Sequence, residues 1–330
     1  MKAAGGRSDA LDMFRGFAIL TMVLANYLAD VAVVPSWLKH APDVGLTFTD
    51  LIAPFFIFAI GVTYGPSFRK RLAPEAGGAR GAVGRFARRY LGFIGIGAVI
   101  SAGEASLGLG GSLVDWGVLQ AIGAAGLVTL AVIALPARWR LCAGLALLAA
   151  YQVLLDLRWL PLVLGSSHGG MHGALSWAAM LMISAAIADD SRAGGGAPSA
   201  ARLAVWGAAL LAVGVVLAVL LPDLAPVSKN RVSASYVLVS TGASSLLFAA
   251  FSLLSDTVAL RIPLLSAWGK NPLVLYVLHF ILLGLVVLPG VPWWHEGASP
   301  LLTICQAAGL VGILSAAAWF MERKGVVVSL

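Results

Sequence analysis

The chain has 330 residues, of which 60% are hydrophobic and only 11% are charged, and its mean hydropathy is +0.92. This composition is too apolar for the surface of a soluble domain and predicts an integral membrane protein. The formal net charge of +7 does not indicate nucleic-acid binding, because the apolar pattern leaves no soluble basic domain to carry that charge.

Apolar runs separated by charged residues, Pro and Gly recur along the chain, and a membrane-crossing helix needs about 20 such residues. We predict spans at residues 14–34, 47–65, 90–107, 116–135, 141–160, 174–188, 203–222, 234–254, 271–289 and 301–321. Two of these runs, 90–107 and 174–188, are short and rich in Gly or Ala. The sequence therefore predicts an all-α integral membrane protein with about ten transmembrane helices in a single domain over residues 1–330.

The distribution of Lys and Arg indicates the orientation of these spans. With a cytoplasmic N-terminus, all but four of the 22 basic residues fall on the cytoplasmic side, the exceptions being Lys39, Arg158, Lys229 and Arg231. We therefore expect both termini in the cytoplasm, the loop around His40 on the outer face, and a multi-pass protein of the plasma or inner membrane.

Polar residues within a span are candidate functional residues, because ionisable groups are costly in a bilayer. Asp12 and Arg15 lie on one helical face at the cytoplasmic end of the first span. Asn26 lies about 16 Å deeper in the same helix. An interfacial ion pair and an interhelical hydrogen bond are the ordinary explanations, and taken alone these residues favour them.

A polar loop precedes the second span in the stretch "HAPDVGLTFTDLIAPFF". Thr47 and Asp50 have the spacing of a capping box, and Pro54 has no N–H to donate, which predicts a kink beside Asp50. His40 lies in the loop that leads to this helix. A loop histidine is usually a solvated surface residue; the functional alternative is a base or acyl acceptor oriented by Asp50 or Asn26.

The stretch "WGKNPLVLYVLHF", residues 268–280, combines a helix start with a deeper histidine. Asn271 and Pro272 are typical of an N-cap and first turn at the cytoplasmic face, with Lys270 beside the positive end of the helix dipole. Such a helix start predicts an anion site. His279 lies about 12 Å deeper, and from the residues alone a core histidine bonded to the backbone is the better explanation.

Other enzyme templates are missing from the sequence. His168 and His172 lie four residues apart in an outer loop without a third candidate ligand, so we expect no metal site. No P-loop, GxSxG elbow or dinucleotide fingerprint occurs, which excludes the familiar soluble-enzyme motifs.

In chain order, several segments resemble the heparan-α-glucosaminide N-acetyltransferase family and its bacterial homologues: "LDMFRGFAILTMVLANY", "HAPDVGLTFTDLIAPFFIFAIGV", "GVLQAIG", "KNRVSASYVLVSTGAS" and "GKNPLVLYVLH". The resemblance extends from about residue 8 to residue 324. It implies a multi-span acyltransferase that takes acetyl-CoA from the cytosolic side and acetylates an amino sugar on the other side. It also implies a homodimer.

The resemblance assigns roles to particular residues. His40 matches the family's active-site histidine, Asn26 its active-site asparagine, and Asp50 the acidic position after the histidine. His279 matches a histidine found in some members. Ala121 stands where the family commonly has Arg after "GVLQ", so a contact made by that Arg is missing or displaced here. Heparan specificity is not carried over, and the acceptor implied is a cell-wall sugar, a polysaccharide unit or a secreted metabolite.

These expectations combine into one mechanistic hypothesis. His40 is the candidate base or acyl acceptor, Asn26 donates to the developing oxyanion, and Asp50 stabilises the imidazolium. The residues expected to bind acetyl-CoA at the cytoplasmic side are Arg15, Lys270, Asn271 and His279. Two alternatives stay open: an O-acyltransferase of surface polysaccharide, and a secondary transporter. The halves of the sequence show no inverted repeat of the kind that transporters often contain.

Overall fold

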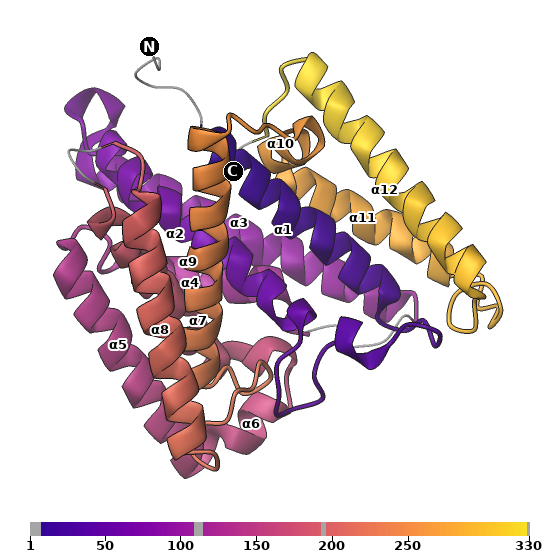
Figure 1. Cartoon of the computed structure of the whole chain (residues 1–330), viewed down its shortest axis with the longest axis horizontal. Helices are drawn as coiled ribbons and strands as arrows, with labels where there is room; N and C mark the ends of the chain where they lie inside the picture. Colours follow the sequence, from indigo (N-terminus) through magenta and orange to yellow (C-terminus); the bar gives the residue numbers. More distant parts are fainter. Residues whose placement is uncertain (1–7, 109–114, 193–195, 329–330) are drawn as a thin grey trace. The chain divides into compact units, whose positions relative to one another are not determined.

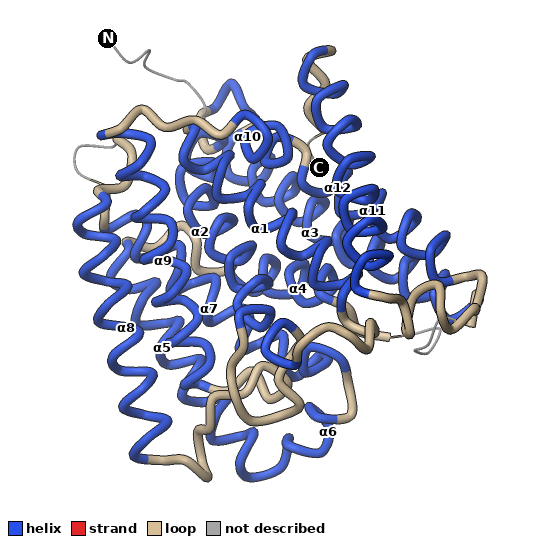
Figure 2. The backbone as a smooth tube through the Cα atoms, turned by 45° about the vertical axis from the view of Figure 1, so that its right-hand side comes forward, coloured by secondary structure: helices blue, strands red, loops and turns tan. Residues whose placement is uncertain are grey.

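A computed structural model describes residues 8–108, 115–192 and 196–328. The chain forms helices joined by mostly short loops (Figure 1), and the described residues contain no β-strand (Figure 2). The α-helices are α1 (Asp9–Leu28), α2 (Ile52–Arg71), α3 (Gly78–Ser106), α4 (Val118–Leu130), α5 (Ala137–Leu154), α6 (Leu160–Leu164), α7 (Gly170–Asp190), α8 (Ala200–Leu220), α9 (Ala234–Thr257), α10 (Pro263–Lys270), α11 (Pro272–Val287) and α12 (Pro300–Arg323). The 3₁₀ turns are η1 (Ser36–Leu38), η2 (Phe48–Leu51), η3 (Pro74–Ala76) and η5 (Ser167–Gly169), and η4 (Leu155–Trp159) is a π turn.

Within the described residues, seven helical segments are long and apolar enough to cross a membrane, so the chain is a multi-pass membrane protein: Asp9–Leu28, Phe48–Arg71, Ala137–Leu164, Ser167–Asp190, Ala200–Leu220, Ala234–Thr257 and Pro300–Arg323. An eighth results if α10 and α11, which bend by 91° at Asn271, count as one span.

Each predicted span overlaps a helix, although α4 has only 13 residues and α10 was not predicted. The chain ends, residues 1–7 and 329–330, lie outside the described residues. The count of ten spans and the orientation of the termini therefore stay predictions.

The helices divide into two compact units. The first comprises α1, η1, η2, α10, α11 and α12, with the last residues of α9. The second comprises α3 to α8, nearly all of α2 and most of α9. The segment Pro42–Leu46, which follows His40, belongs to the second unit although the residues on either side of it belong to the first. The single domain expected from the sequence stays a prediction.

Two glycines bring α1 and α10 together in the first unit. A Cβ atom on Gly16 of α1 would lie 1.8 Å from the carbonyl oxygen of Leu265, and a Cβ on Gly269 of α10 would lie 1.8 Å from the carbonyl oxygen of Asp12. Small residues of this kind allow the backbones of neighbouring membrane helices to approach closely. The contact is reciprocal, so neither helix can accept a larger side chain at this crossing without moving apart.

Local sequence signals determine where the first and last long helices begin. The Ser8 hydroxyl accepts a hydrogen bond from the N–H of Leu11 at the start of α1. The Ser299 hydroxyl likewise accepts one from the N–H of Leu302, with Pro300 at the first position of α12. Serine is a favoured N-cap because its hydroxyl satisfies an N–H that has no partner within the helix, and Pro at the first position loses nothing there.

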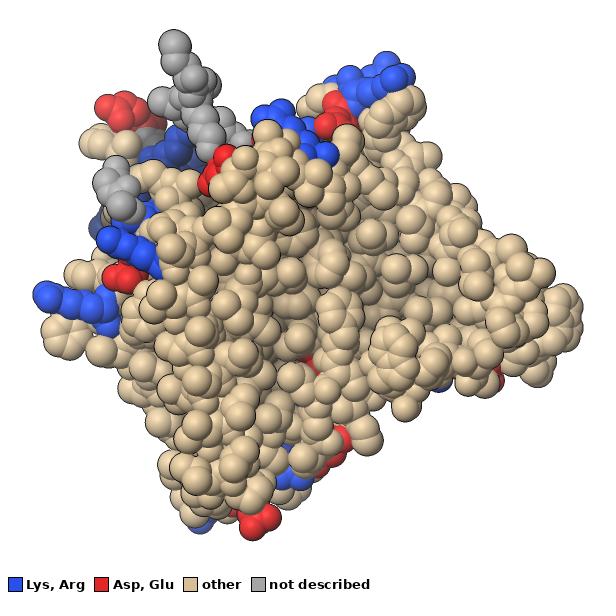
Figure 3. All heavy atoms as spheres, in the orientation of Figure 1, with Lys and Arg blue, Asp and Glu red and all other residues tan. Residues whose placement is uncertain are grey.

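The outer faces of α8 and α12 are apolar. Exposed side chains along these helices include Val205, Val213, Leu301, Ile304 and Ile313. In Figure 3 the visible lengths of α8 and of α12 are free of Lys, Arg, Asp and Glu between their ends. Such surfaces are unfavourable in water and favourable against lipid chains. They are consistent with helices that face the bilayer.

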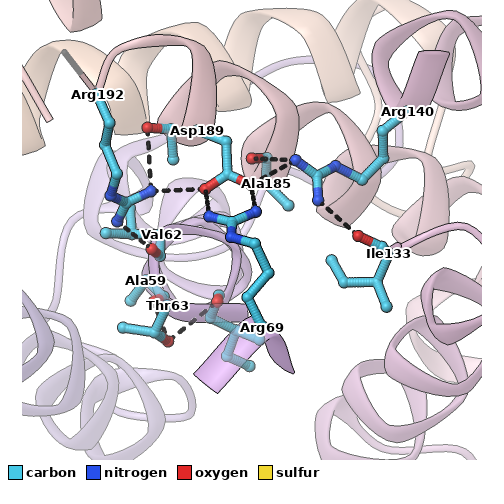
Figure 4. A network of polar contacts seen from close by, with 11 residues as sticks. Ala59, Val62, Thr63, Arg69, Ile133, Arg140, Ala185, Asp189 and Arg192 are labelled. Atoms are coloured by element: carbon cyan, nitrogen blue, oxygen red, sulfur yellow. Dashed lines mark hydrogen bonds and ion pairs between the residues drawn. The ribbon is translucent and has the colours of Figure 1, made fainter. Parts of the chain in front are cut away.

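A buried ion-pair cluster organises the second unit (Figure 4). Asp189, near the end of α7, accepts two hydrogen bonds from Arg69 of α2, at 2.9 and 3.1 Å. Arg140 of α5 contacts the same carboxylate at 2.6 Å and Arg192 contacts it at 2.8 Å. The Asp189 side chain is 7% exposed and that of Arg140 only 1%. Three guanidinium groups thus surround one nearly buried carboxylate, and of the three only that of Arg69 is largely exposed.

The same arginines bind backbone carbonyls that have no helical partner. Pro66 of α2 offers no N–H to the carbonyl of Val62 four residues earlier, and Nη2 of Arg192 donates to that oxygen at 2.6 Å. Nη1 of Arg140 donates to the carbonyl of Ile133, just after α4, at 3.0 Å. The cluster therefore connects α2, α4, α5 and α7.

We expect Asp189→Asn to destabilise the protein. The substitution keeps the shape of the side chain but leaves the charge of buried Arg140 without its counter-ion, and removing one partner of a buried ion pair typically costs about 3–5 kcal/mol. Thermal unfolding of the purified protein in detergent measures the loss. Asp223→Asn, at an exposed aspartate after α8, is the matched control; equal stability of the two variants would contradict the prediction.

We also expect Gly16→Ala to lower the unfolding temperature. The added methyl group would meet a backbone carbonyl, which cannot rotate away, and overpacking of this kind costs about 1–3 kcal/mol. Gly309→Ala in α12 is the control, because a Cβ there would meet nothing within 4 Å. Since alanine favours helix over glycine, the control should be as stable as the parent or slightly more stable. A Gly16→Ala variant that matched this control would show that the helix crossing adapts.

Candidate functional site

The first polar pair of the candidate site joins His40 to Asp50 in the first unit. His40 lies in the loop between η1 and η2, and Asp50 lies in η2. The His40 Nδ1 atom is 2.7 Å from Oδ1 of Asp50. The His40 side chain is 42% exposed, whereas that of Asp50 is completely buried. A solvent-accessible imidazole is therefore held by a carboxylate that water does not reach.

The other carboxylate oxygen of Asp50 closes the loop between the two residues. Oδ2 accepts the backbone N–H of Ala41 at 3.2 Å and that of Thr47 at 2.9 Å. The Thr47 hydroxyl lies 2.7 Å from the carbonyl oxygen of Lys39. The structure confirms the predicted capping box at Thr47 and Asp50. Asp50 thus holds both the imidazole and the backbone of the loop that carries it.

The helical segment after this loop begins with a 3₁₀ turn and not, as expected, with a turn of α-helix. Residues 48–51 form the 3₁₀ turn η2, and the α-helix begins only at Ile52. Pro54 therefore lies in the first turn of α2, where an N–H would have no helical partner in any case. The 3₁₀ turn places Asp50 before the α-helix, and the kink at Pro54 stays a prediction.

The contact with Asp50 determines which nitrogen of His40 acts as a base. An ionised carboxylate only accepts hydrogen bonds, so Nδ1 carries the proton and Nε2 carries the lone pair. A carboxylate in this position orients the ring and stabilises the imidazolium formed when Nε2 takes a proton. The pair can therefore perform general-base or nucleophilic chemistry.

The second polar pair of the first unit joins Asn26 of α1 to His279 of α11. Asn26 Nδ2 lies 3.0 Å from Nε2 of His279, and His279 Nδ1 contacts the carbonyl oxygen of Tyr276. Because that carbonyl only accepts, Nδ1 is the protonated nitrogen and Nε2 accepts from the Asn26 amide. His279 is completely buried, and its ring centroid lies 4.2 Å from that of Phe280.

Sequence reasoning identified only part of this pair. The alternative explanation of His279, a histidine bonded to helix backbone, is confirmed by the contact with Tyr276. The bond to Asn26 was not expected, since Asn26 and His279 are separated by 253 positions. The depth of both residues in apolar helices was the available signal, because polar groups at such depth need partners.

The predicted anion site at the start of α11 has intramolecular partners. Lys270 Nζ lies 2.5 Å from a carboxylate oxygen of Glu322. Asn271 occupies the N-cap position as predicted, but its side chain binds the C-terminal segment, donating to the carbonyl of Val326 at 2.9 Å and accepting from the N–H of Val328 at 2.8 Å. The roles of these residues in donor binding stay predictions.

Arg15 lies in α1 next to Gly16, which contacts α10. Among the residues that the structure describes, no group of three or more His, Cys, Asp or Glu side chains is placed to hold a metal ion. His172, which was expected in an outer loop, lies in the first turn of α7 and packs its ring against Trp159, with centroids 4.9 Å apart.

Comparison with known families gives these pairs a context. The family model described as heparan-alpha-glucosaminide N-acetyltransferase, catalytic, matches residues 7–172. A search of curated proteins finds no match. The matched half of the chain contains Asn26, His40 and Asp50, whereas His279 lies beyond it. The match confirms the family that the sequence motifs resemble and indicates membrane acetyltransferase activity. This multi-pass membrane protein belongs to the heparan-alpha-glucosaminide N-acetyltransferase family.

Proposed function

We propose that the protein transfers the acetyl group of cytosolic acetyl-CoA to an amino group or hydroxyl of a sugar-type acceptor on the outer side of the plasma or inner membrane. The observation that carries this proposal is the pair formed by exposed His40 and buried Asp50, within the region matched by the catalytic model. The homodimer implied by the resemblance belongs to the same proposal.

His40 is the residue that handles the proton in this reaction. The donor supplies an activated acyl group as a thioester. Nε2 of His40 removes a proton from the acceptor while the acceptor nitrogen or oxygen forms its bond to the acyl carbon; the carbon–sulfur bond then breaks, and the leaving thiolate receives the proton from the imidazolium. In the two-step version Nε2 first attacks the acyl carbon, the carbon–sulfur bond breaks and the CoA thiolate leaves. The acceptor then takes the acyl group from the imidazole, and the proton that it loses goes to the thiolate. In both versions Asp50 stabilises the positive charge on the ring.

Asn26 is suited to stabilise the oxyanion. Its side-chain amide has two hydrogens, and one of them is directed at His279 Nε2. The second can be donated to the thioester oxygen as negative charge develops there, which is the role of an oxyanion-hole donor. His279 then orients the Asn26 amide, in addition to any contact with the donor.

Donor binding at the cytoplasmic side is proposed for Arg15, Lys270, Asn271 and His279. The CoA phosphates carry several negative charges, and charge-assisted bonds to phosphate are stronger than those between neutral groups. Lys270 forms an ion pair with the carboxylate of Glu322. We propose that a donor phosphate replaces Glu322 at Lys270 when the donor binds.

His40→Ala is expected to abolish acetyl transfer without unfolding the protein. Loss of a general base lowers the rate by about 10²- to 10⁴-fold, and the exposed ring contributes little to packing. The assay follows labelled acetyl groups from acetyl-CoA to amino sugars, with purified protein in lipid nanodiscs. His172→Ala, at a histidine in the first turn of α7, should keep parental activity.

Full activity of His40→Ala would refute the proposed role of this residue. Label that stays on the parental protein when the acceptor is omitted would support an acyl-histidine. A protein that does not bind acetyl-CoA but takes up solute into vesicles would be a transporter, contrary to the proposal.

His279→Ala is expected to lower kcat by about tenfold while leaving the KM for acetyl-CoA nearly unchanged. The substitution removes the acceptor of the Asn26 amide, and a lost orientation affects the transition state more than ground-state binding. His279→Gln, whose carbonyl oxygen can accept the same hydrogen bond, should retain more activity. A higher KM for acetyl-CoA at unchanged kcat would instead place His279 in the donor site.

A further inference from the structure

The loop that carries His40 has a second anchor, distinct from Asp50. Within the second unit, Arg231 binds Asp43 through both sides of the carboxylate: Nη2 lies 2.5 Å from Oδ2, and Nε lies 3.1 Å from Oδ1. The hydroxyl of Ser228 donates to Oδ1 of Asp43 at 2.9 Å. Only Ala41 and Pro42 separate Asp43 from His40 in the chain. Arg231 is one of the few basic residues that the sequence places on the outer side.

Backbone contacts reinforce this anchor on either side of Asp43. The Asn230 side chain donates to the carbonyl oxygen of Pro42 at 2.5 Å. The N–H of Gly45 donates to the carbonyl oxygen of Val227 at 2.8 Å. Gly45 has φ +129°, a conformation that is favourable for glycine and strained for other residues. The whole segment Pro42–Leu46 therefore lies along residues 227–231, between α8 and α9.

Residues 231 and 232, at the end of the stretch that binds Pro42–Leu46, are themselves held by hydrogen bonds. The Tyr151 hydroxyl of α5 donates to the carbonyl of Arg231 at 2.7 Å. The Ser176 hydroxyl of α7 donates to the carbonyl of Val232 at 2.6 Å. The backbone of Arg231 and Val232 is thus fixed by two helices of the same unit, and the Arg231 side chain presents a preorganised fork to Asp43.

Chain connectivity links this anchor to the catalytic pair. Ala41 and Thr47, the residues that flank Pro42–Leu46, both donate their N–H groups to Oδ2 of Asp50. The segment held by Arg231 is therefore the far end of a closed loop whose two ends meet at Asp50. A displacement of the far end pulls on Ala41, and Ala41 is the neighbour of His40 in the chain.

The ion pair is ionised at neutral pH. The hydrogen bond from Arg231 lowers the pKa of Asp43, and Asp43 in turn raises the pKa of Arg231. A lowered carboxyl pKa means that the stabilisation is present above the ordinary pKa and is lost only as pH falls through the lowered value. The side chain of Asp43 is 35% exposed and that of Arg231 is 20% exposed. An ion pair with this much exposure adds little to the free energy of unfolding. Its value lies in its two-point geometry.

We propose that Arg231 is a positioning residue for acetyl transfer: through Asp43 it holds the His40 loop in the orientation that the reaction requires. The proposal rests on the function proposed above for His40. Arg231 is not a catalytic residue, since its contacts are with Asp43 and not with the reacting groups. Three features thus hold the loop in its conformation: the carboxylate of Asp50, the backbone conformation of Gly45 and the ion pair of Arg231 with Asp43.

The test combines hydrogen exchange with kinetics in the full-length protein. In Arg231→Gln we expect faster amide exchange in residues 41–47, because the bond from Gly45 to Val227 opens more often. We expect kcat to fall by up to about a hundredfold, as small misplacements of a reacting group can do. The KM for acetyl-CoA and the unfolding temperature should stay near the parental values. Arg158→Gln, at an exposed arginine of η4, is the control and should change none of these quantities.

Two further variants separate positioning from a general loss of structure. Asp43→Asn breaks the same contact from the other side and should reproduce both effects. The double variant Asp43→Asn/Arg231→Gln should lose no more activity than either single variant, because residues that act as a unit are not additive. Arg231→Lys keeps the charge without the fork and should recover part of kcat.

Unchanged exchange in residues 41–47, or faster exchange with parental kcat, would overturn the positioning role. Additive losses in the double variant would also overturn it. Failure of the proposed function has a different signature, namely acetyl transfer that survives His40→Ala. The exchange experiment does not depend on activity, so it tests the docking of the loop by itself.

Discussion

A charge that is removed from water must find a partner, and in each of the two units an aspartate shows how this membrane protein meets that constraint. Asp50 is completely buried and is bonded to an imidazole and to backbone N–H groups. Asp189 is nearly buried and is surrounded by three guanidinium groups. Each carboxylate gathers segments that are distant in the chain, because only oppositely charged or hydrogen-bonding groups can offset its desolvation.

The two aspartates have different chemical consequences. All partners of Asp189 described above are permanently charged arginines, so its cluster serves to join helices and to satisfy carbonyls such as that of Val62. Asp50 has a partner that can exchange protons, and that partner is exposed. A buried carboxylate beside an accessible imidazole orients the ring so that its exposed nitrogen can act as a base. The same carboxylate among arginines only holds helices together. The function proposed for this family member therefore rests on the N-terminal end of α2 and not on the more highly charged cluster.

Several features were predictable because their causes are local. The apolar runs, the capping box of Thr47 and Asp50, and the helix start at Asn271 all depend on residues within a few positions of one another. The helical segment begins after Thr47 as predicted, but its first turn is 3₁₀, because a 3₁₀ turn and an α-helical turn share the same capping residues. The separate helix α10 was not predicted because it is short. It meets α11 in a sharp bend at Asn271. The Asn-Pro pair at this bend was interpreted from the sequence only as the start of one helix.

By itself, the sequence determined the membrane class, most helices, the family and the identity of the candidate catalytic residues, since composition, hydropathy and motif spacing are properties of the chain alone. Only the tertiary structure decided which of these residues are partners. The pairing of Asn26 with His279, of Asp43 with Arg231, and of Asp189 with its arginines joins positions far apart in the sequence. Such pairs form because a folded apolar interior leaves each polar group few places to find a hydrogen bond, and that choice depends on how the helices pack.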